Sequence, residues 1–225
     1  LSKEVAQWTV KPKVYFEEWD SPMISAILWV SEIIALAGGV NVFADLGEAS
    51  LAKDRILKDT DEVLRKNPDI ILFGGMAATG GPFAKQAKEL GIKAKIIGGD
   101  GICSPTLYEL AGDAVENIVC STVGIPKESL NNSANFLKNY QERFKTEVQI
   151  YAPMAYDAVM IIVDAMKRSN STNAADILKA IPTTNYAGLS GQITFDEKGD
   201  LKESYITLSQ FKDKKILTLE VVKMQ

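Results

Sequence analysis

Three short segments carry the residue types that could bind a ligand. Residues 17–20 read Glu-Glu-Trp-Asp, residues 74–81 read Gly-Gly-Met-Ala-Ala-Thr-Gly-Gly, and residues 98–101 read Gly-Gly-Asp-Gly. A carboxylate such as Asp100 at the edge of a half-dry cleft could pair with an ammonium group, and Trp19 could stack on a flat ligand. These residue types favour the binding of a small polar molecule.

Two of these side chains also have a purely structural explanation. Asp100 could cap the helix expected at residues 104–111, and Trp19 could pack against its own loop. The glycines of residues 74–81 would let backbone amides approach a phosphate at a helix start. The segment nevertheless lacks the Gly-Lys-Ser/Thr ending of a phosphate loop and the Gly-x-Gly-x-x-Gly spacing of a dinucleotide fold, so a nucleotide or flavin site is only an alternative hypothesis.

Acidic and sulfur-containing side chains leave two further questions open. Glu17, Glu18 and Asp20 could form a weak oxygen site for a cation, although a solvated acidic loop is the simpler interpretation. Cys103 and Cys120 would suit one disulfide in an oxidising compartment, or they could be two buried free thiols. The sequence alone favours neither explanation of the cysteines.

The composition excludes several functional classes. The 225 residues contain no histidine, which removes the commonest general base near neutral pH and the commonest metal ligand. The 25 basic and 29 acidic residues are spread along the chain without a basic stripe, so nucleic acid is not an expected partner. We expect no catalytic residues, no metal and no cofactor.

The elements that must position these segments alternate between strand and helix as far as residue 121. The expected strands are 13–17, 40–44, 69–73, 94–97 and 117–121, and the expected helices are about 22–37, 60–66, 82–90 and 105–111. This alternation predicts an α/β fold with a flavodoxin-like, doubly wound parallel sheet of five strands between helix layers. Such sheets bind ligands at the carboxyl ends of their strands, near the reversal of strand order. The candidate ligand-binding residues are therefore Trp19, Asp20, Gly75, Met76, Ala77 and Asp100.

The rest of the chain is expected to be rich in helix. Helices are expected at 132–144, 152–168 and 173–181, followed by a β-hairpin of strands 204–211 and 215–222. The second of these helices is apolar on nearly every face, which is typical of a buried core helix. Its apolar run is interrupted by Asp157 and Asp164, so no membrane insertion is expected. We expect one lobe of residues 11–121 with 203–225, and a separate helix-rich segment of residues 122–202.

Six segments after residue 72 carry a resemblance to a known family: residues 73–76, 98–103, 110–114, 148–153, 156–159 and 195–200. On these segments, the chain from residue 74 onward resembles the branched-chain amino acid binding proteins of ABC transporters. The resemblance implies a periplasmic-binding-protein-like fold, a periplasmic location, an amino acid ligand and a transporter permease as partner. It also implies that Asp100 receives the α-ammonium group, and that Met76 replaces an aromatic residue which stacks on the ligand in many relatives.

Residues 12–72 resemble a different family, the vitamin B12 and iron-siderophore binding proteins, in their second lobe. The matching segments are residues 12–23, 29–32, 36–39, 42–45 and 67–71. Since two resemblances meet inside one apolar strand at 69–73, they imply a recombined or engineered chimera. Trp19 would then correspond to a cleft tryptophan of that second family.

A chimera of this kind would lack one wall of the amino acid cleft. We therefore expect a solute-binding-type protein without catalysis and with weak or no ligand binding. The alternatives are a functional branched-chain amino acid binding protein and a flavodoxin-like nucleotide or flavin domain. Residues 122–202 could exchange between chains and form a homodimer. Any secretory signal is expected to have been removed, or the protein is cytoplasmic if it is an engineered recombinant.

Overall fold

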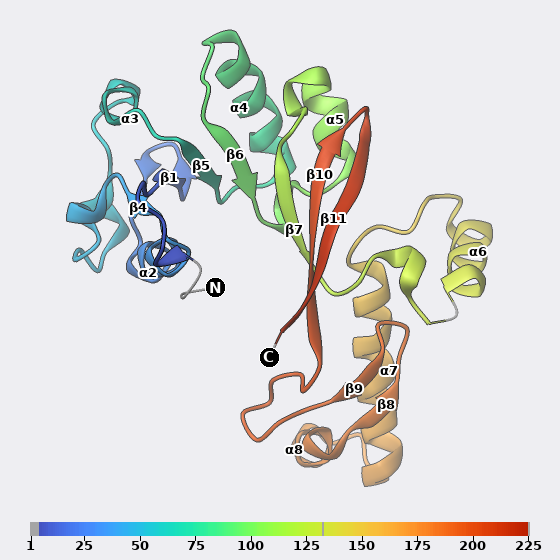
Figure 1. Ribbon diagram of the computed structural model, residues 1–225. Helices are drawn as coiled ribbons and strands as arrows, with labels where there is room; N and C mark the ends of the chain where they lie inside the picture. The colour runs from blue at the N-terminus through green and yellow to red at the C-terminus, as the bar shows by residue number, and fades with distance from the viewer. Residues whose placement is uncertain (1–4, 132, 225) are drawn as a thin grey trace. The chain divides into compact units, whose positions relative to one another are not determined.

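The computed structural model describes residues 5–131 and 133–224, and the chain divides into two compact units (Figure 1). Unit 1 contains Leu1–Ser121 and Ser209–Leu217, and unit 2 contains Thr122–Leu208 and Thr218–Gln225. The chain passes between the units within strands β7 (Val119–Val123), β10 (Ser204–Lys212) and β11 (Lys215–Met224). Neither unit is therefore one continuous stretch of sequence.

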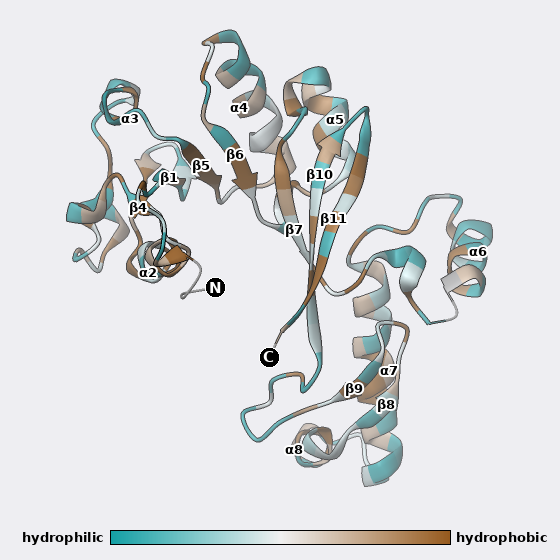
Figure 2. Cartoon of the chain, viewed as in Figure 1, coloured by the Kyte–Doolittle hydropathy of each residue, from teal (hydrophilic) through white to brown (hydrophobic). Residues whose placement is uncertain are grey.

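A mostly parallel sheet organises unit 1. Within the described residues its strand order is β11-β10-β7-β6-β5-β1-β4. The parallel part consists of β1 (Lys13–Glu17), β4 (Val40–Asn41), β5 (Ile70–Phe73), β6 (Lys95–Gly98) and β7, which pair as parallel neighbours. Figure 2 shows hydrophobic stretches along β5, β6 and β7, as expected of strands buried on both faces. The prediction of a doubly wound α/β fold with five parallel strands is confirmed.

Helices cover both faces of this sheet. Val14 and Phe16 pack with Val30 and Ile34 of α2 (Leu28–Leu36) on one face. The intervening Tyr15 packs on the other face, in a cluster that includes side chains of α3 (Thr60–Lys66) and α4 (Ala77–Glu89). Because successive strand residues point to opposite faces, these clusters define the three layers.

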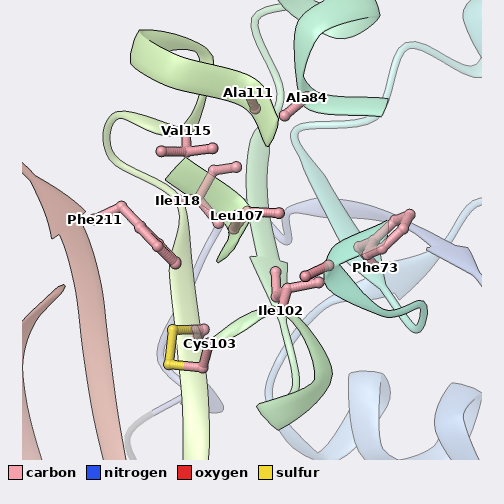
Figure 3. Packing of buried hydrophobic residues seen from close by; sticks show 11 residues of the cluster. Phe73, Ala84, Ile102, Cys103, Leu107, Ala111, Val115, Ile118 and Phe211 are labelled. Carbon is pink, nitrogen blue, oxygen red and sulfur yellow. A yellow bond between two sulfur atoms is a disulfide. The ribbon is translucent and has the colours of Figure 1, made fainter. Parts of the chain in front are cut away.

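The largest cluster of buried side chains lies under α4 and α5 (Pro105–Ala111). Phe73, Ile102, Leu107, Val115 and Phe211 are members of it (Figure 3). Phe211 comes from β10, and its backbone exchanges hydrogen bonds with Asn117 and Ile118 beside β7. The C-terminal hairpin therefore completes a core that is otherwise built from the first half of the chain.

A helix cap and a tight turn explain two elements that the sequence predicted well. The Asp59 side chain accepts a hydrogen bond from the Glu62 N–H at 2.9 Å and caps the start of α3. In the hairpin, Asp213 and Lys214 both have positive φ, as the two-residue turn of a tight hairpin requires. The predicted hairpin of β10 and β11 is confirmed.

The expected helix from residue 22 is wrong at its start. Residues 19–24 form a small hairpin of β2 (Trp19–Asp20) and β3 (Met23–Ile24), and α2 begins only at Leu28. The Met23 carbonyl accepts a hydrogen bond from Leu57, and the Ile24 carbonyl accepts one from Glu18. These tertiary hydrogen bonds hold the segment extended, although its proline and aspartate are typical of a helix start.

The predicted start of α4 was also wrong, because the helix begins at Ala77 and not at residue 82. Gly80 and Gly81 lie inside it, where a Cβ would stand 3.1 Å from Ile102 and 2.5 Å from Leu110. Glycine is needed here for close packing between elements and does not mark a loop. Strand β4 is also shorter than expected, since the chain turns into a short 3₁₀ helix after Phe43.

Unit 2 is built around the long helix α7 (Ala152–Ser169), with α6 (Ser133–Phe144) and α8 (Ala174–Ala180). The first residue of the expected helix 132–144 lies outside the described residues. A small hairpin of β8 (Asn185–Ala187) and β9 (Gln192–Thr194) was not expected from the sequence. The remaining 3₁₀ turns are η1 (Ala44–Leu46), η2 (Ala52–Arg55), η3 (Asp100–Ile102), η4 (Gly112–Val115), η5 (Lys127–Ser129) and η6 (Ile181–Thr183).

Helix α7 is not the wholly buried core helix that the sequence predicted. It buries every fourth residue, at Pro153, Asp157, Ile161 and Ala165, while Val159 is 59% exposed. The buried Asp157 carboxylate accepts hydrogen bonds from the backbone N–H groups of residues 189 and 190, both at 2.8 Å. Among the described residues, no helix is long and apolar enough to cross a membrane.

Candidate functional site

The carboxyl ends of three parallel strands lie in register at one edge of unit 1. Glu17 of β1 pairs with Phe73 of β5, which pairs with Gly98 of β6. The Gly74 N–H donates a hydrogen bond to the Glu17 carbonyl at 2.8 Å, so the loop after β5 starts beside the end of β1. This is the edge at which open parallel sheets bind ligands.

The loops after β5 and β6 are in direct contact at this edge. A Cβ on Gly101 would lie 2.5 Å from the Met76 Sδ and 2.9 Å from the Gly75 carbonyl oxygen. Ala77 follows immediately as the first residue of α4, and Asp100 is the neighbour of Gly101. The structure therefore brings together four of the candidate residues, namely Gly75, Met76, Ala77 and Asp100.

Asp100 begins the 3₁₀ turn η3, and its carbonyl accepts a hydrogen bond from the Cys103 N–H at 3.0 Å. The N-cap residue of α5 is Ser104. Met76 precedes α4 as its N-cap residue and is 66% exposed. An exposed thioether thus precedes the first turn of α4, and the first N–H groups of a helix generally lack partners within it.

Trp19 and Asp20 lie on the β2–β3 hairpin that follows β1. Trp19 is 60% exposed, and its indole N–H donates to the Ser21 carbonyl at 3.2 Å. Asp20 is exposed as well, and its negative charge acts on the carboxyl group of Glu17. Trp19 is thus bonded to its own hairpin turn, and Asp20 acts electrostatically on the last residue of β1.

Glu17 is a buried side chain and not part of a solvated acidic loop. It accepts a hydrogen bond from the hydroxyl group of Tyr15, which is also buried. Burial raises the pKa of Glu17 above its ordinary 4.5, the Tyr15 hydrogen bond opposes this, and the charge of Asp20 adds to it. Burial also raises the pKa of Tyr15, and the neighbouring Glu17 contributes in the same direction.

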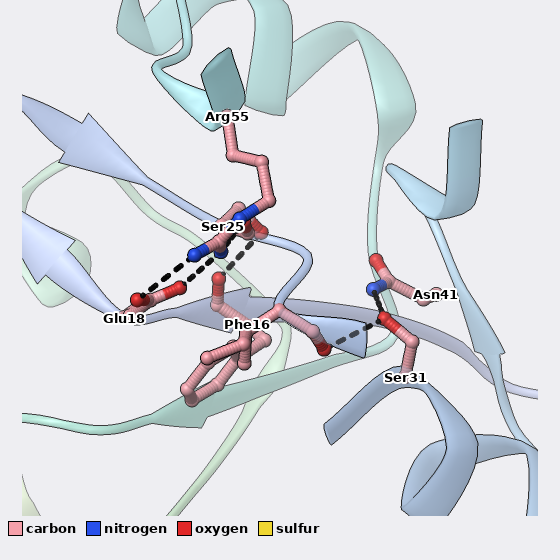
Figure 4. A network of polar contacts seen from close by, with 7 residues as sticks. Phe16, Glu18, Ser25, Ser31, Asn41 and Arg55 are labelled. Atoms are coloured by element: carbon pink, nitrogen blue, oxygen red, sulfur yellow. Dashed lines mark hydrogen bonds and ion pairs between the residues drawn. The ribbon is translucent and has the colours of Figure 1, made fainter. Parts of the chain in front are cut away.

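Glu18 is held by an ion pair with Arg55, which is 3% exposed (Figure 4). The Arg55 Nη1 also donates to the Ser25 carbonyl at 2.7 Å, and the Ser25 hydroxyl donates to the Phe16 carbonyl at 2.6 Å. The weak oxygen site that these three carboxylates could have formed loses its basis, because Glu17 and Glu18 already have partners in the fold. Across the described residues, no group of three or more acidic, cysteine or histidine side chains is arranged to hold a metal.

A disulfide joins Cys103 and Cys120, with 5.5 Å between their Cα atoms. Cys103 directly follows η3, and Cys120 lies on β7 in register with Gly98. Both cysteines are buried in the cluster under α4 and α5. The turn that carries Asp100 is thus covalently attached to the neighbouring strand.

A cavity of about 370 Å³ lies at the opposite, amino-terminal ends of β6 and β7. Its lining includes Lys88, Asp113 and Glu116. Lys88 donates to the Asp113 carbonyl at 3.2 Å, and Glu116 accepts a hydrogen bond from the Tyr108 hydroxyl at 2.8 Å. Since these polar groups bond to other parts of the same unit, the carboxyl-terminal edge remains the better candidate site.

Two features of the site were missed at the level of sequence. Gly101 has no side chain to suggest a role, yet it determines how closely the two loops approach. For the cysteines, a disulfide was one of the two explanations left open and a strand at 117–121 was expected, but the sequence did not show that the bond attaches the Asp100 turn to this strand. The signal that could have revealed both is the pattern Gly-Asp-Gly followed by a cysteine directly after an apolar strand.

Comparison with known proteins shows what this chain resembles. A family model described as periplasmic binding protein matches residues 60–215. The chain is 30% identical over 135 residues to the Leu/Ile/Val-binding protein homolog 1 of Brucella abortus, which covers 60% of this chain and 36% of that protein.

Solved structures show a similar relationship. A leucine binding protein from Thermotoga maritima superposes with a TM-score of 0.63 at 29% identity, over 72% of this chain and 47% of that one. A putative branched-chain amino acid ABC transporter protein from Rhodospirillum rubrum superposes with a TM-score of 0.63 at 19% identity, over 97% of this chain and 64% of that one. The chain thus spans only 36% of the curated relative. The second structure covers 97% of this chain, so the shared fold is not confined to residues 60–215.

Proposed function

The chain belongs to the periplasmic binding protein family, and we propose that it binds a small aliphatic amino acid such as leucine, isoleucine or valine. The family binds solutes and does not catalyse reactions, so the prediction of a non-enzymatic protein is confirmed by this membership. One observation carries the proposal: the Gly75–Met76 segment and the turn bearing Asp100 are in contact at the carboxyl ends of adjacent parallel strands.

The two loops offer complementary charges to a zwitterion. The Asp100 carboxylate can receive an α-ammonium group through a charge-assisted hydrogen bond. The first turn of α4 presents partly positive N–H groups, which favour a carboxylate. The exposed Met76 adds apolar surface for an aliphatic side chain, whereas the Ala77 side chain is buried in the core cluster and contributes through its place at the start of α4. Trp19 and Asp20 are further candidate contacts from the β2–β3 hairpin.

Calorimetric titration with leucine, isoleucine and valine tests the proposal. We expect heat of binding for the wild-type protein and at least a tenfold weaker Kd for Asp100→Asn, because a hydrogen bond to a charged group contributes about 1.5–3 kcal/mol. Asp113→Asn is a matched control, since it removes the same charge from an exposed residue at the opposite ends of the strands. Absence of heat at millimolar amino acid would contradict the proposal and favour the weak or absent binding expected for a single cleft wall.

The compartment and the transport partner are part of the same proposal. The names of the relatives, together with the family, support a location outside the cytoplasm and a permease of an ABC transporter as partner. The Cys103–Cys120 disulfide is consistent with an oxidising compartment. We expect the protein to be recovered outside the cytoplasm with this disulfide formed. Its mass should then be the same before and after treatment with a thiol-alkylating reagent.

Our proposal does not require a chimera. The relatives named above are amino acid binding or transport proteins, and the Rhodospirillum rubrum fold covers 97% of this chain, so a single fold accounts for nearly all of it. The B12-type resemblance of that segment stays a sequence-level prediction. The division into lobes and a homodimer formed by exchange of residues 122–202 also stay predictions, and solution mass tests the latter.

The flavin or nucleotide alternative loses its structural basis. The segment 74–81 is not a glycine-rich loop, because α4 begins at Ala77. Gly80 and Gly81 are buried inside this helix against Ile102 and Leu110. Their amides therefore belong to a helix interior and not to a phosphate cradle.

A further inference from the structure

We propose that the Cys103–Cys120 disulfide positions the Asp100 turn against the Gly75–Ala77 segment and thereby sets the affinity for the ligand. This inference rests on the proposed function, since it concerns the same site. It assigns a role in binding to two buried cysteines that touch no ligand. They are positioning residues, because they act through the segment that carries Asp100.

The Asp100 turn is a short arch, residues 99–102, with both ends fixed on β7. At its start, Gly98 pairs with Cys120 in the sheet. At its end, Cys103 is bonded to the same Cys120. The strand order places β7 on one side of β6 and β5 on the other, so the arch is tied on the side away from the β5 loop.

The opposite side of the arch is limited by direct contact. Gly101 lies so close to Gly75 that a Cβ would stand 2.9 Å from the Gly75 carbonyl oxygen. Movement of the arch toward α4 is therefore blocked by backbone. At the other end, the disulfide keeps Cys103 at a fixed distance from β7. The arch therefore stays at the place in the sheet edge where Gly101 meets Gly75.

A second contact, made by Ile102, also holds the arch. It explains why the loss of the disulfide would loosen the arch without unfolding unit 1. Ile102 is almost fully buried and packs against α4, where a Cβ on Gly80 would lie 3.1 Å from its Cγ2. This apolar contact holds the inner side of the arch and does not depend on the cysteines. Gly99, Asp100 and Gly101 would then gain freedom, because glycine restricts the backbone least.

The test removes both sulfur atoms and measures the arch directly. In a Cys103→Ala/Cys120→Ala variant we expect faster amide hydrogen exchange at residues 99–103 and also at residues 75–77, together with a leucine Kd at least tenfold higher. Val115→Ala is the matched control, because Val115 is buried in the same cluster but lies on η4. This control should leave both exchange and Kd as in the wild type at a temperature where each protein is folded.

The outcomes separate this inference from the proposed function. Unchanged exchange at residues 75–77, or an unchanged leucine Kd with faster exchange, overturns the role of the disulfide in positioning. If the wild type binds no amino acid, the proposed function fails, and the exchange measurement still decides whether the disulfide holds the loops together.

A second variant covers the case in which the double alanine protein does not fold. Gly101→Ala leaves the disulfide intact but pushes the arch away from Gly75, and it should raise the leucine Kd to a similar extent. An unchanged Kd for Gly101→Ala would show that the spacing of the loops does not matter for binding.

Discussion

The β2–β3 hairpin region and the Asp100 arch both follow parallel strands, but different interactions hold their conformations. Around residues 17–20, charged side chains are used by the fold: Glu17 bonds to Tyr15, and Glu18 bonds to Arg55. The arch instead consists mainly of glycine and backbone, and its shape is fixed by a disulfide and by contact with the β5 loop. In residues 17–20 two of the acidic side chains therefore serve the fold, and the arch is the part that we propose for binding.

The strongest test of this difference is the removal of Arg55. Arg55→Ala leaves the Glu18 carboxylate and the Ser25 carbonyl without their buried partner, and we expect a loss of about 3 kcal/mol in the free energy of unfolding. Arg65→Ala is the control, because its pair with Asp59 is exposed at 3.9 Å and contributes less than about 1 kcal/mol. Denaturant titration measures both values.

The Arg55→Ala variant can also be tested for ligand binding. If the Arg55–Glu18 pair is purely structural, folded Arg55→Ala protein should bind leucine with the affinity of the wild type. A large loss of affinity in folded protein would contradict the division between a structural hairpin region and a binding arch.

A pH titration examines the buried Glu17. Its pKa is raised in the folded state, so folding favours the protonated form, and this contribution is complete below the unfolded pKa. It is lost as the pH rises from the ordinary 4.5 through the higher folded value. Relative to Glu17→Gln, the wild type should therefore lose stability across this range, as measured by denaturant titration at a series of pH values.

The comparison variant for that titration is Tyr15→Phe. It removes a hydrogen bond that lowers the pKa of Glu17, so the loss of stability should extend to higher pH than in the wild type. If the wild type and Glu17→Gln show the same pH dependence, the carboxyl group of Glu17 is not buried in solution.

The smallest effect is expected at Trp19. This side chain is 60% exposed, so Trp19→Ala should change the free energy of unfolding by no more than about 0.5 kcal/mol. As a candidate contact it should raise the leucine Kd about threefold, a typical contribution of a single aromatic contact. An increase larger than that of Asp100→Asn would reverse the ranking of the two regions.

The elements that were predictable from sequence are those set by local pattern. The apolar run at residues 70–73 became a parallel strand, and Pro105–Ala111 and Thr60–Lys66 are helices as expected. In these segments hydrophobic period, capping residues and chain breakers all favour the same structure. The parallel sheet and its carboxyl-terminal edge could be predicted for that reason.

The errors occur where distant contacts decide the local structure. Gly80 and Gly81 were expected in a turn, but close packing against Ile102 and Leu110 places them inside α4. The backbone around Met23 is held extended by Leu57, more than thirty positions away. Sequence pattern cannot reveal such contacts, and for the same reason it identified Asp100 and Met76 as candidates but not the contact made by Gly101.

The path of the chain through unit 1 has a consequence for biosynthesis. Phe211 is fully buried in the main cluster of this unit, and residues 209–217 belong to the unit although they follow the whole of the helix-rich segment. Because Phe211 is part of this core, unit 1 cannot be completed on the ribosome until the segment up to residue 217 has emerged. Synthesis of the whole helix-rich segment therefore precedes the closing of the core, and molecular chaperones can bind the unfinished unit during that interval.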